Sequence, residues 1–193
     1  RQRIEIVRKL VENGLSKQLD LNLLMIEKEA ESDRVIALAG NPNVGKSTVF
    51  NALTGMNQHT GNWPGKTVAS AQGRHVYKDM GYILVDLPGT YSLMAHSAEE
   101  EVARNFICFG GADAVIVVCD ATCLERNLNL VLQTLEITPH VAVCVNLMDE
   151  ARRKGIQIDL AGLEKKLGVP VLGFCYGHQI TAVTLGGSVF HPE

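Results

Sequence analysis

The segment Gly40–Ser47, GNPNVGKS, is the feature of the sequence that most constrains the fold. It fits the pattern G-x-x-x-x-G-K-[S/T], in which successive backbone N–H groups point at a phosphate. The apolar run Val35–Ala39 comes directly before it, and Ser47–Leu53 behind it has helical spacing. A helix N-terminus adds a positive partial charge at the same place. The sequence therefore predicts an α/β domain that binds a phosphate where its first buried strand ends.

The nucleotide-contacting residues expected in this loop share the short stretch between strand and helix: Gly40, Asn41, Pro42, Asn43, Val44, Gly45, Lys46, Ser47 and Thr48. Lys46 is expected to reach the outer phosphates and to act in catalysis. The Ser47 hydroxyl is expected to be a ligand of Mg²⁺.

Apolar runs alternate with amphipathic segments along the rest of the chain. Further strands are expected at Ile83–Val85, Ala114–Cys119, Val141–Val145 and Val169–Leu172, and further helices at Ala98–Phe109, Asn127–Glu136 and Leu160–Leu167. This alternation predicts a mostly parallel sheet of about six strands with helices on both faces. Ligands of such sheets bind at the carboxyl ends of the strands, so the loops there are the candidate site.

Composition excludes several classes of function. The 193 residues carry 18 Lys and Arg against 21 Asp and Glu, a net charge of −3, so no basic surplus points to nucleic acid. The longest apolar stretches, such as Ala114–Cys119, are far shorter than the ~18 residues of a membrane span, which predicts a soluble chain. The five cysteines form no CxxC pair, which argues against a zinc site.

A second motif, Asp86-Leu87-Pro88-Gly89, follows the apolar residues Tyr82–Val85 and stands 40 residues after Lys46. A carboxylate at this strand end can hold Mg²⁺ through water, and the Gly89 N–H can approach a γ-phosphate. Asp86 is therefore a candidate metal ligand and Gly89 a candidate catalytic residue.

Between these motifs lies Asn57–Val68, a polar stretch without a regular period that contains Gly65-Lys66-Thr67. Thr67 is the candidate for a second hydroxyl ligand of Mg²⁺ that also senses the γ-phosphate, and Gly65 and Lys66 are candidate nucleotide contacts. The alternative is that Thr67 is an ordinary loop threonine.

The last motif, Asn146-Leu147-Met148-Asp149, follows the strand expected at Val141–Val145 and fits the pattern N-x-x-D. A carboxylate accepts hydrogen bonds from both N1–H and N2–H₂ of guanine, and adenine offers no such donor pair, so Asp149 predicts GTP over ATP. Leu147 replaces the lysine that is usual in this loop, which weakens binding without changing the choice of base.

These four motifs resemble, in order and spacing, those of Ras-like GTPases of the translation-factor type. The stretches GNPNVGKSTVFNALTG, HTGNWPGKTV, DLPGTYSL and CDATCLERNLNLVLQTLE are similar to the amino-terminal cytoplasmic G domain of FeoB-type ferrous iron transporters, over about residues 33–170. The resemblance implies a Ras-like P-loop GTPase fold, GTP and GDP as ligands with Mg²⁺, and coupling to a membrane permease for Fe²⁺ that is missing from this chain. It implies a place on the cytoplasmic side of the cell membrane.

Two features bear on the rate of hydrolysis. Ras-like proteins orient the attacking water with a Gln just after DxxG, and Thr90 stands there instead, so intrinsic hydrolysis is expected to be slow. The family resemblance implies that Asn43 helps to bind K⁺ beside the phosphates, which would stimulate hydrolysis. The alternative is that Asn43 is a turn residue tolerant of left-handed dihedral angles.

The two ends of the chain differ from the middle. Residues 1–32 are expected to form an amphipathic helix and a linker, residues 33–173 the G domain, and residues 174–193 an atypical tail in place of the fifth guanine motif. The tail sequences PVLGFCYGHQ and FHPE resemble fragments of class I glutamine amidotransferases, with Cys175, His191 and Glu193 as the implied catalytic residues.

Two alternative functions remain at this point. The tail is too short to build the second core that an amidotransferase needs, so a working glutaminase is disfavoured. The other alternative is a nucleotide-binding scaffold with an impaired guanine site, since Leu147 and the missing fifth motif both weaken the base contacts.

Overall fold

The computed structural model describes residues 33–55, 59–61, 70–77 and 80–174. Several predictions concern residues outside these ranges. They are the amphipathic helix within residues 1–32, the candidate residues Gly65, Lys66 and Thr67, and the tail residues Cys175, His191 and Glu193.

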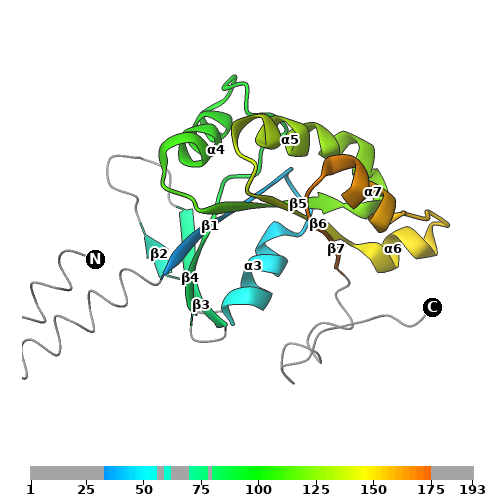
Figure 1. Cartoon of the computed structure of the whole chain (residues 1–193), viewed down its shortest axis with the longest axis horizontal. Coiled ribbons are helices and arrows are strands. Elements are labelled where there is room, and N and C mark those ends of the chain that lie inside the picture. The colour runs from blue at the N-terminus through cyan, green and yellow to red at the C-terminus, as the bar shows by residue number, and fades with distance from the viewer. Residues whose placement is uncertain (1–32, 56–58, 62–69, 78–79, 175–193) are drawn as a thin grey trace, which may run out of the picture.

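One sheet runs through the described part of the chain and contains seven strands in the order β2-β3-β4-β1-β5-β6-β7 (Figure 1). The strands are β1 Arg34–Gly40, β2 His59–Gly61, β3 Ser70–Tyr77, β4 Met80–Asp86, β5 Ala114–Asp120, β6 Val141–Asn146 and β7 Val171–Gly173. β4, β1, β5, β6 and β7 are parallel to their neighbours in this group, whereas β3 pairs antiparallel with both β2 and β4. The mostly parallel sheet is confirmed.

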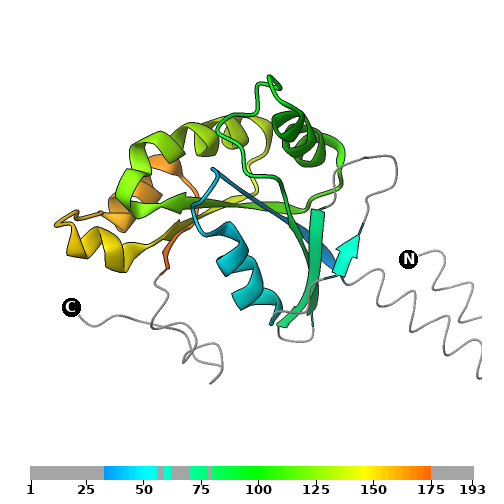
Figure 2. The ribbon, with the colours of Figure 1, turned by 180° about the vertical axis from the view of Figure 1, so that it is seen from behind.

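The helices cover both faces of this sheet, as predicted. They are α3 Lys46–Thr54, α4 Ala98–Phe109, α5 Leu124–Ile137 with a 3₁₀ turn at Ala121–Cys123 before it, α6 Met148–Arg153 and α7 Leu160–Leu167. Figures 1 and 2 show α3 on one side of the sheet and α4 and α5 on the other. Among the described residues no helix is both long enough and apolar enough to span a membrane.

Two helices have the predicted bounds, and in the structure each begins after a side chain that caps it. Ser97 precedes α4, and its hydroxyl accepts a hydrogen bond from the Glu100 N–H at 3.2 Å. Asp159 does the same for α7 through the Gly162 N–H at 2.8 Å. Gly168 then ends α7 in the left-handed conformation. Such caps satisfy backbone groups that the helix itself leaves without partners.

Each face of the sheet has its own apolar core. On the α3 face the core contains Leu38, Val44, Val49, Phe50, Leu84, Val118 and Cys144. The larger core on the other face joins the strands to α4, α5, α6 and α7. Because the central strands are buried on both sides, their sequences are nearly continuous apolar runs, which is why they could be predicted.

Some predictions of secondary structure were wrong. Residues 59–61, within the stretch expected to be irregular, form β2, and β3 was not predicted at all. The sequence of β3, SAQGRHVY, is largely polar because an antiparallel strand near the sheet edge is only partly buried. α6 is too short to show a period, and β7 begins at Val171 rather than Val169, since Pro170 has no N–H to donate to β6.

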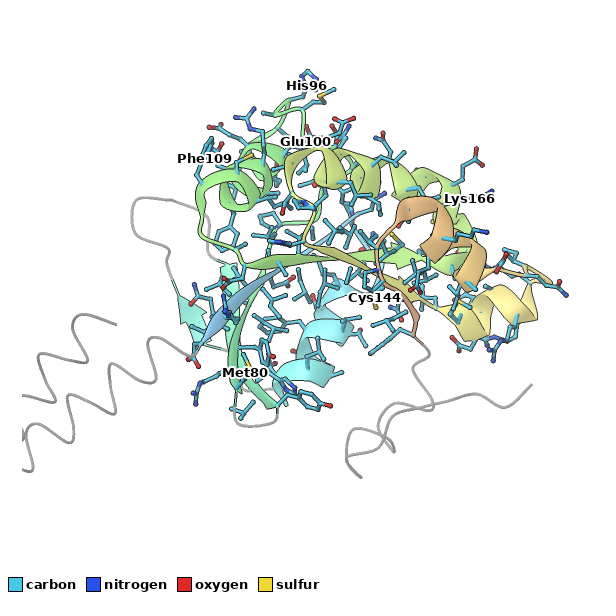
Figure 3. The ribbon with its side chains drawn as sticks, in the orientation of Figure 1. Met80, His96, Glu100, Phe109, Cys144 and Lys166 are labelled. Carbon is cyan, nitrogen blue, oxygen red and sulfur yellow. The ribbon has the colours of Figure 1, made fainter. Side chains whose placement is uncertain are left out.

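Replacing Phe50 tests how α3 is held on the sheet. The Phe50 side chain is fully buried, so we expect Phe50→Ala to lower the free energy of unfolding by about 3–5 kcal/mol in urea denaturation. Phe109→Ala is the matched control, because Phe109 is 85% exposed at the end of α4 (Figure 3) and its loss is expected to cost less than about 0.5 kcal/mol. Equal losses for the two variants would contradict the assigned core.

Candidate functional site

The phosphate loop is built on backbone conformations that few residues adopt. Asn43 and Gly45 both have left-handed backbone angles, with φ of 65° and 79°. The Gly45 carbonyl accepts hydrogen bonds from the N–H groups of Thr48 and Val49, which starts α3. A Cβ atom on Gly45 would collide with the Asn146 side-chain amide, so only glycine fits here. The loop therefore curls directly at the amino end of α3.

The phosphate loop is fastened to the end of β6 by one side chain. Asn146 Nδ2 donates to the Val44 carbonyl oxygen at 2.9 Å, across 102 residues of sequence. Both residues are buried. The amide of the N-x-x-D motif thus sets the position of the loop expected to hold phosphate.

Asp86 lies at the end of β4, the strand that pairs directly with β1 and so lies next to the phosphate loop. Its carboxylate is paired with the Lys46 ammonium group, and both side chains are largely buried. The next residues run along β1: the Leu87 N–H donates to Leu38 and the Thr90 N–H to Gly40. The predicted convergence of Lys46 and Asp86 is therefore observed.

Gly89 is brought against the phosphate loop by the same run of backbone. A Cβ atom on Gly89 would lie 3.1 Å from the Cα of Pro42, so the two backbones are in close contact. Together they border a cavity of about 490 Å³, whose lining residues are Asn41, Pro42, Asn43, Gly45, Lys46, Ser47, Thr48 and Gly89. Seven of the nine predicted loop residues and Gly89 thus face one cavity.

The groups that line this cavity, together with Asp86 behind Lys46, fit Mg²⁺ and phosphate. Ser47 supplies a hydroxyl and Asp86 a carboxylate, which are the oxygen ligands that Mg²⁺ prefers. Lys46 and the backbone N–H groups at the start of α3 supply positive charge. The third predicted metal ligand, Thr67, lies outside the described residues.

The Asn146–Asp149 motif is shaped by a tight turn between β6 and α6. Leu147 has a left-handed φ of 61°, and the buried Met148 anchors the start of α6 in the core. Asp149 Oδ1 is buried and has no hydrogen-bond partner among the described residues. The other oxygen, Oδ2, lies 3.6 Å from the Arg153 guanidinium. A buried acceptor without a donor fits the N1–H and N2–H₂ groups of a guanine.

Sequence reasoning missed two polar side chains near the site. Asn127 on α5 is buried, accepts from the Asp120 N–H at 3.1 Å and donates to the Cys123 carbonyl at 2.9 Å, so it holds the turn after β5. Gln133, also on α5, accepts from the Leu93 N–H at 2.7 Å. Both lie in the helix predicted at Asn127–Glu136, but helical spacing does not show which polar side chain will bond to a distant backbone group.

Two buried cysteines of the sheet are packing residues. Burial raises the pKa of Cys119 and of Cys144 to about 12. A thiol with such a pKa stays protonated at neutral pH and is a poor nucleophile. We therefore assign neither cysteine to the site.

The chain matches known proteins over most of its length. The family model described as ferrous iron transport protein B matches residues 34–185. The Fe(2+) transporter FeoB of Salmonella typhimurium and that of Escherichia coli K12 are each 46% identical over 141 residues, which is 71% of this chain and 18% of each relative. This chain therefore spans about a fifth of the length of these curated relatives.

Solved structures match the fold described above. The G domain of T. maritima FeoB aligns with a TM-score of 0.70 and 43% identity, over 77% of this chain and 89% of that one. The cytosolic domain of T. maritima FeoB in its GMPPNP form aligns with a TM-score of 0.71 and 44% identity, over 77% of this chain and 57% of that one. The FeoB G domain of Methanococcus jannaschii aligns with a TM-score of 0.64 and 46% identity, over 74% of this chain and 85% of that one.

Replacing Asn146 tests the link between the two loops. Asn146→Ala removes the donor to Val44 and leaves a buried carbonyl without a partner, so we expect unfolding to become easier by about 1–3 kcal/mol. Chemical denaturation of the purified chain measures this. Asn129→Ala is the matched control, because Asn129 is exposed on α5 and should change stability by less than about 0.5 kcal/mol. An Asn146 variant as stable as this control would show that the link contributes nothing.

Proposed function

The chain belongs to the FeoB family of ferrous iron transport proteins, and from this premise we propose that it binds GTP and hydrolyses it as the G domain of such a transporter. The observation that carries the proposal is the convergence of three motifs on one edge of the sheet, with Asn146 joining the base motif to the phosphate loop. The GDP and GMPPNP forms of the T. maritima cytosolic domain support guanine nucleotides as its ligands.

In this proposal Asp149 selects the base. Its buried Oδ1 accepts from guanine, and an adenine in the same position would leave that oxygen without a donor. Leu147 covers the base with an apolar side chain in place of the usual lysine. Asn146 contributes by holding the phosphate loop at a fixed distance from the base.

The phosphates bind to the backbone N–H groups of the loop and to Lys46, which then leaves its ion pair with Asp86. Ser47, Thr67 and Asp86 are the proposed residues for Mg²⁺, which neutralises charge on the phosphates when bound. Gly65 and Lys66 are proposed to contact the nucleotide beside Thr67. Gly89 and Thr67 bind the γ-phosphate only while it exists, so hydrolysis should release residues 57–68 and 87–97.

Hydrolysis in this site is proposed to be slow. Catalysis of phosphoryl transfer depends mainly on position and on charge neutralisation. Thr90 stands where Ras-like proteins carry a water-orienting Gln, and it is buried with its N–H committed to Gly40. We therefore assign no side-chain base to the attacking water.

A K⁺ ion beside the phosphates is the proposed source of additional positive charge. Asn43 is exposed and lines the cavity, so its side-chain oxygen can be a ligand there. Its left-handed φ also agrees with a turn role, and the two roles are compatible. An ion at this place would stabilise the charge that develops on transfer, as an arginine does in other enzymes.

Coupling to iron transport is a proposal about a longer protein. The relatives named above are Fe(2+) transporters, and this chain corresponds to 18% of their length. We propose that the domain lies on the cytoplasmic side of the cell membrane and acts on a permease in the same transporter. Nucleic acid is not proposed as a partner.

Neither alternative function gains support from the family match. The impaired scaffold is suggested by Leu147 and the missing fifth motif, and the unpartnered Asp149 Oδ1 supports a base contact despite both. The amidotransferase would depend on Cys175, His191 and Glu193, which lie outside the described residues.

Exchanging the carboxylate of Asp149 for an amide tests the base assignment. In Asp149→Asn the side chain offers one donor and one acceptor, which match O2 and N1–H of xanthine but not the two donors of guanine. We expect the affinity for GDP to fall by at least about tenfold and the affinity for XDP to rise, measured by calorimetry. An unchanged preference for GDP would show that Asp149 does not contact the base.

Hydrolysis rates in K⁺ and in Na⁺ at one ionic strength test the role of Asn43. We expect faster phosphate release in K⁺, and we expect Asn43→Ala to remove the difference between the salts while Mg²⁺-GDP still binds. Asn129→Ala serves as the control that should keep the K⁺ effect. Equal rates of the unmodified chain in the two salts would exclude the ion.

A further inference from the structure

We propose that Gln133 of α5 is a positioning residue that pre-orders the segment after Asp86-Leu87-Pro88-Gly89 and thereby makes the protein favour GTP over GDP. This inference rests on the proposed function, since it assumes that Gly89 contacts a γ-phosphate. It assigns to α5 a part in the site that none of the four nucleotide-binding motifs includes.

The contact that supports it joins a helix side chain to an irregular backbone. The Leu93 N–H donates to Gln133 Oε1 at 2.7 Å, across 40 residues of sequence. Leu93 is 5% exposed and its side chain packs in the core shared with α4 and α5. Residues near Leu93 form neither helix nor strand, so a side chain rather than a backbone carbonyl satisfies this partly buried N–H.

A second contact lies on the same side of α5. The Arg126 guanidinium sits over the ring of Tyr91, with its carbon 5.4 Å from the ring centroid. Arg126 and Gln133 are seven residues apart, which is two helical turns, so they share a face of the helix. Because Arg126 is exposed and Tyr91 half exposed, this cation–π contact is the weaker of the two.

The segment is consequently held at both ends. On the phosphate side the Thr90 N–H donates to the Gly40 carbonyl at 3.1 Å, and Gly89 packs on Pro42. On the α5 side, three residues later, Leu93 is bonded to Gln133. Because only three residues separate Thr90 from Leu93, the backbone at Gly89 has little conformational freedom while both hydrogen bonds are formed.

This restraint bears on GTP and GDP differently. GTP binding requires the Gly89 N–H to be ordered beside the γ-phosphate, and a segment that is already held loses less conformational entropy when this happens. GDP has no γ-phosphate and gains nothing from an ordered Gly89. A ligand favours the ordered state of the segment only if it binds that state more tightly than the unordered one, and of the two nucleotides only GTP does so. Loss of the Gln133 bond should therefore weaken the binding of GTP and not that of GDP.

The test compares fluorescent GDP and a fluorescent GMPPNP, both with Mg²⁺, on the full chain and its variants. Gln133→Met keeps the length of the side chain but has no acceptor at its end. We expect it to lower the affinity for the GMPPNP probe by about three- to tenfold, the worth of one hydrogen bond, and to leave the GDP affinity within about twofold. Gln133→Glu retains an acceptor oxygen and should restore the preference.

A local readout separates positioning from a general loss of stability. Hydrogen exchange at the Leu93 amide should be faster in Gln133→Met and close to unmodified in Gln133→Glu. Asn129→Met is the matched control, because it places the same side chain on an exposed position of α5 and should change neither affinity. If Gln133→Met does not fold, Gln133→Asn carries the test, since the shorter amide cannot reach the Leu93 N–H.

Two results would overturn the inference. One is an equal loss of affinity for both nucleotides in Gln133→Met, and the other is an unchanged affinity for both. If the unmodified chain binds neither probe, the proposed function itself is wrong. If it binds both probes and Gln133→Met gives either of these two results, only the inference about Gln133 is wrong.

Discussion

The hydrogen bond from Asn146 Nδ2 to the Val44 carbonyl is the contact on which the rest of the site depends. It joins the loop after β1 to the last residue of β6, although β5 lies between these strands in the sheet. Both partners are buried, so water cannot replace the bond if it is lost. The same amide packs on Gly45 and excludes any larger residue there. The bond therefore fixes the distance between the loop expected to bind the phosphates and the motif expected to bind the base.

The parallel sheet explains how an acidic chain can bind an anion. β1, β4 and β6 all end at one edge, which brings Asp86 and Asn146 to the loop that follows β1. Positive charge is needed only at that edge, and Lys46 with the N–H groups at the start of α3 supplies it. The net charge of −3 therefore has no bearing on phosphate binding.

The sequence predicted the parts of the molecule that need special residues. The phosphate loop needs Gly45 for its left-handed turn, so its motif could be recognised, and α4 and α7 could be predicted from the helical spacing of their apolar residues. β3 was missed because it is only partly buried and carries polar residues, and β2 was missed because its three residues are too few to show a period. Gln133 was missed because its partner is a backbone N–H 40 residues away, which only the packing of α5 brings within reach.

The central claim is that the Asn146–Asp149 motif and the phosphate loop form one guanine-nucleotide site. Displacement of a fluorescent GDP from the chain by unlabelled GDP or by ADP, with Mg²⁺ present, tests it most directly. The two competitors share their phosphates and ribose and differ only in the base that Asp149 would contact. The account predicts that GDP displaces the probe at concentrations at least about a hundredfold lower than ADP does. Equal displacement by GDP and ADP would contradict it.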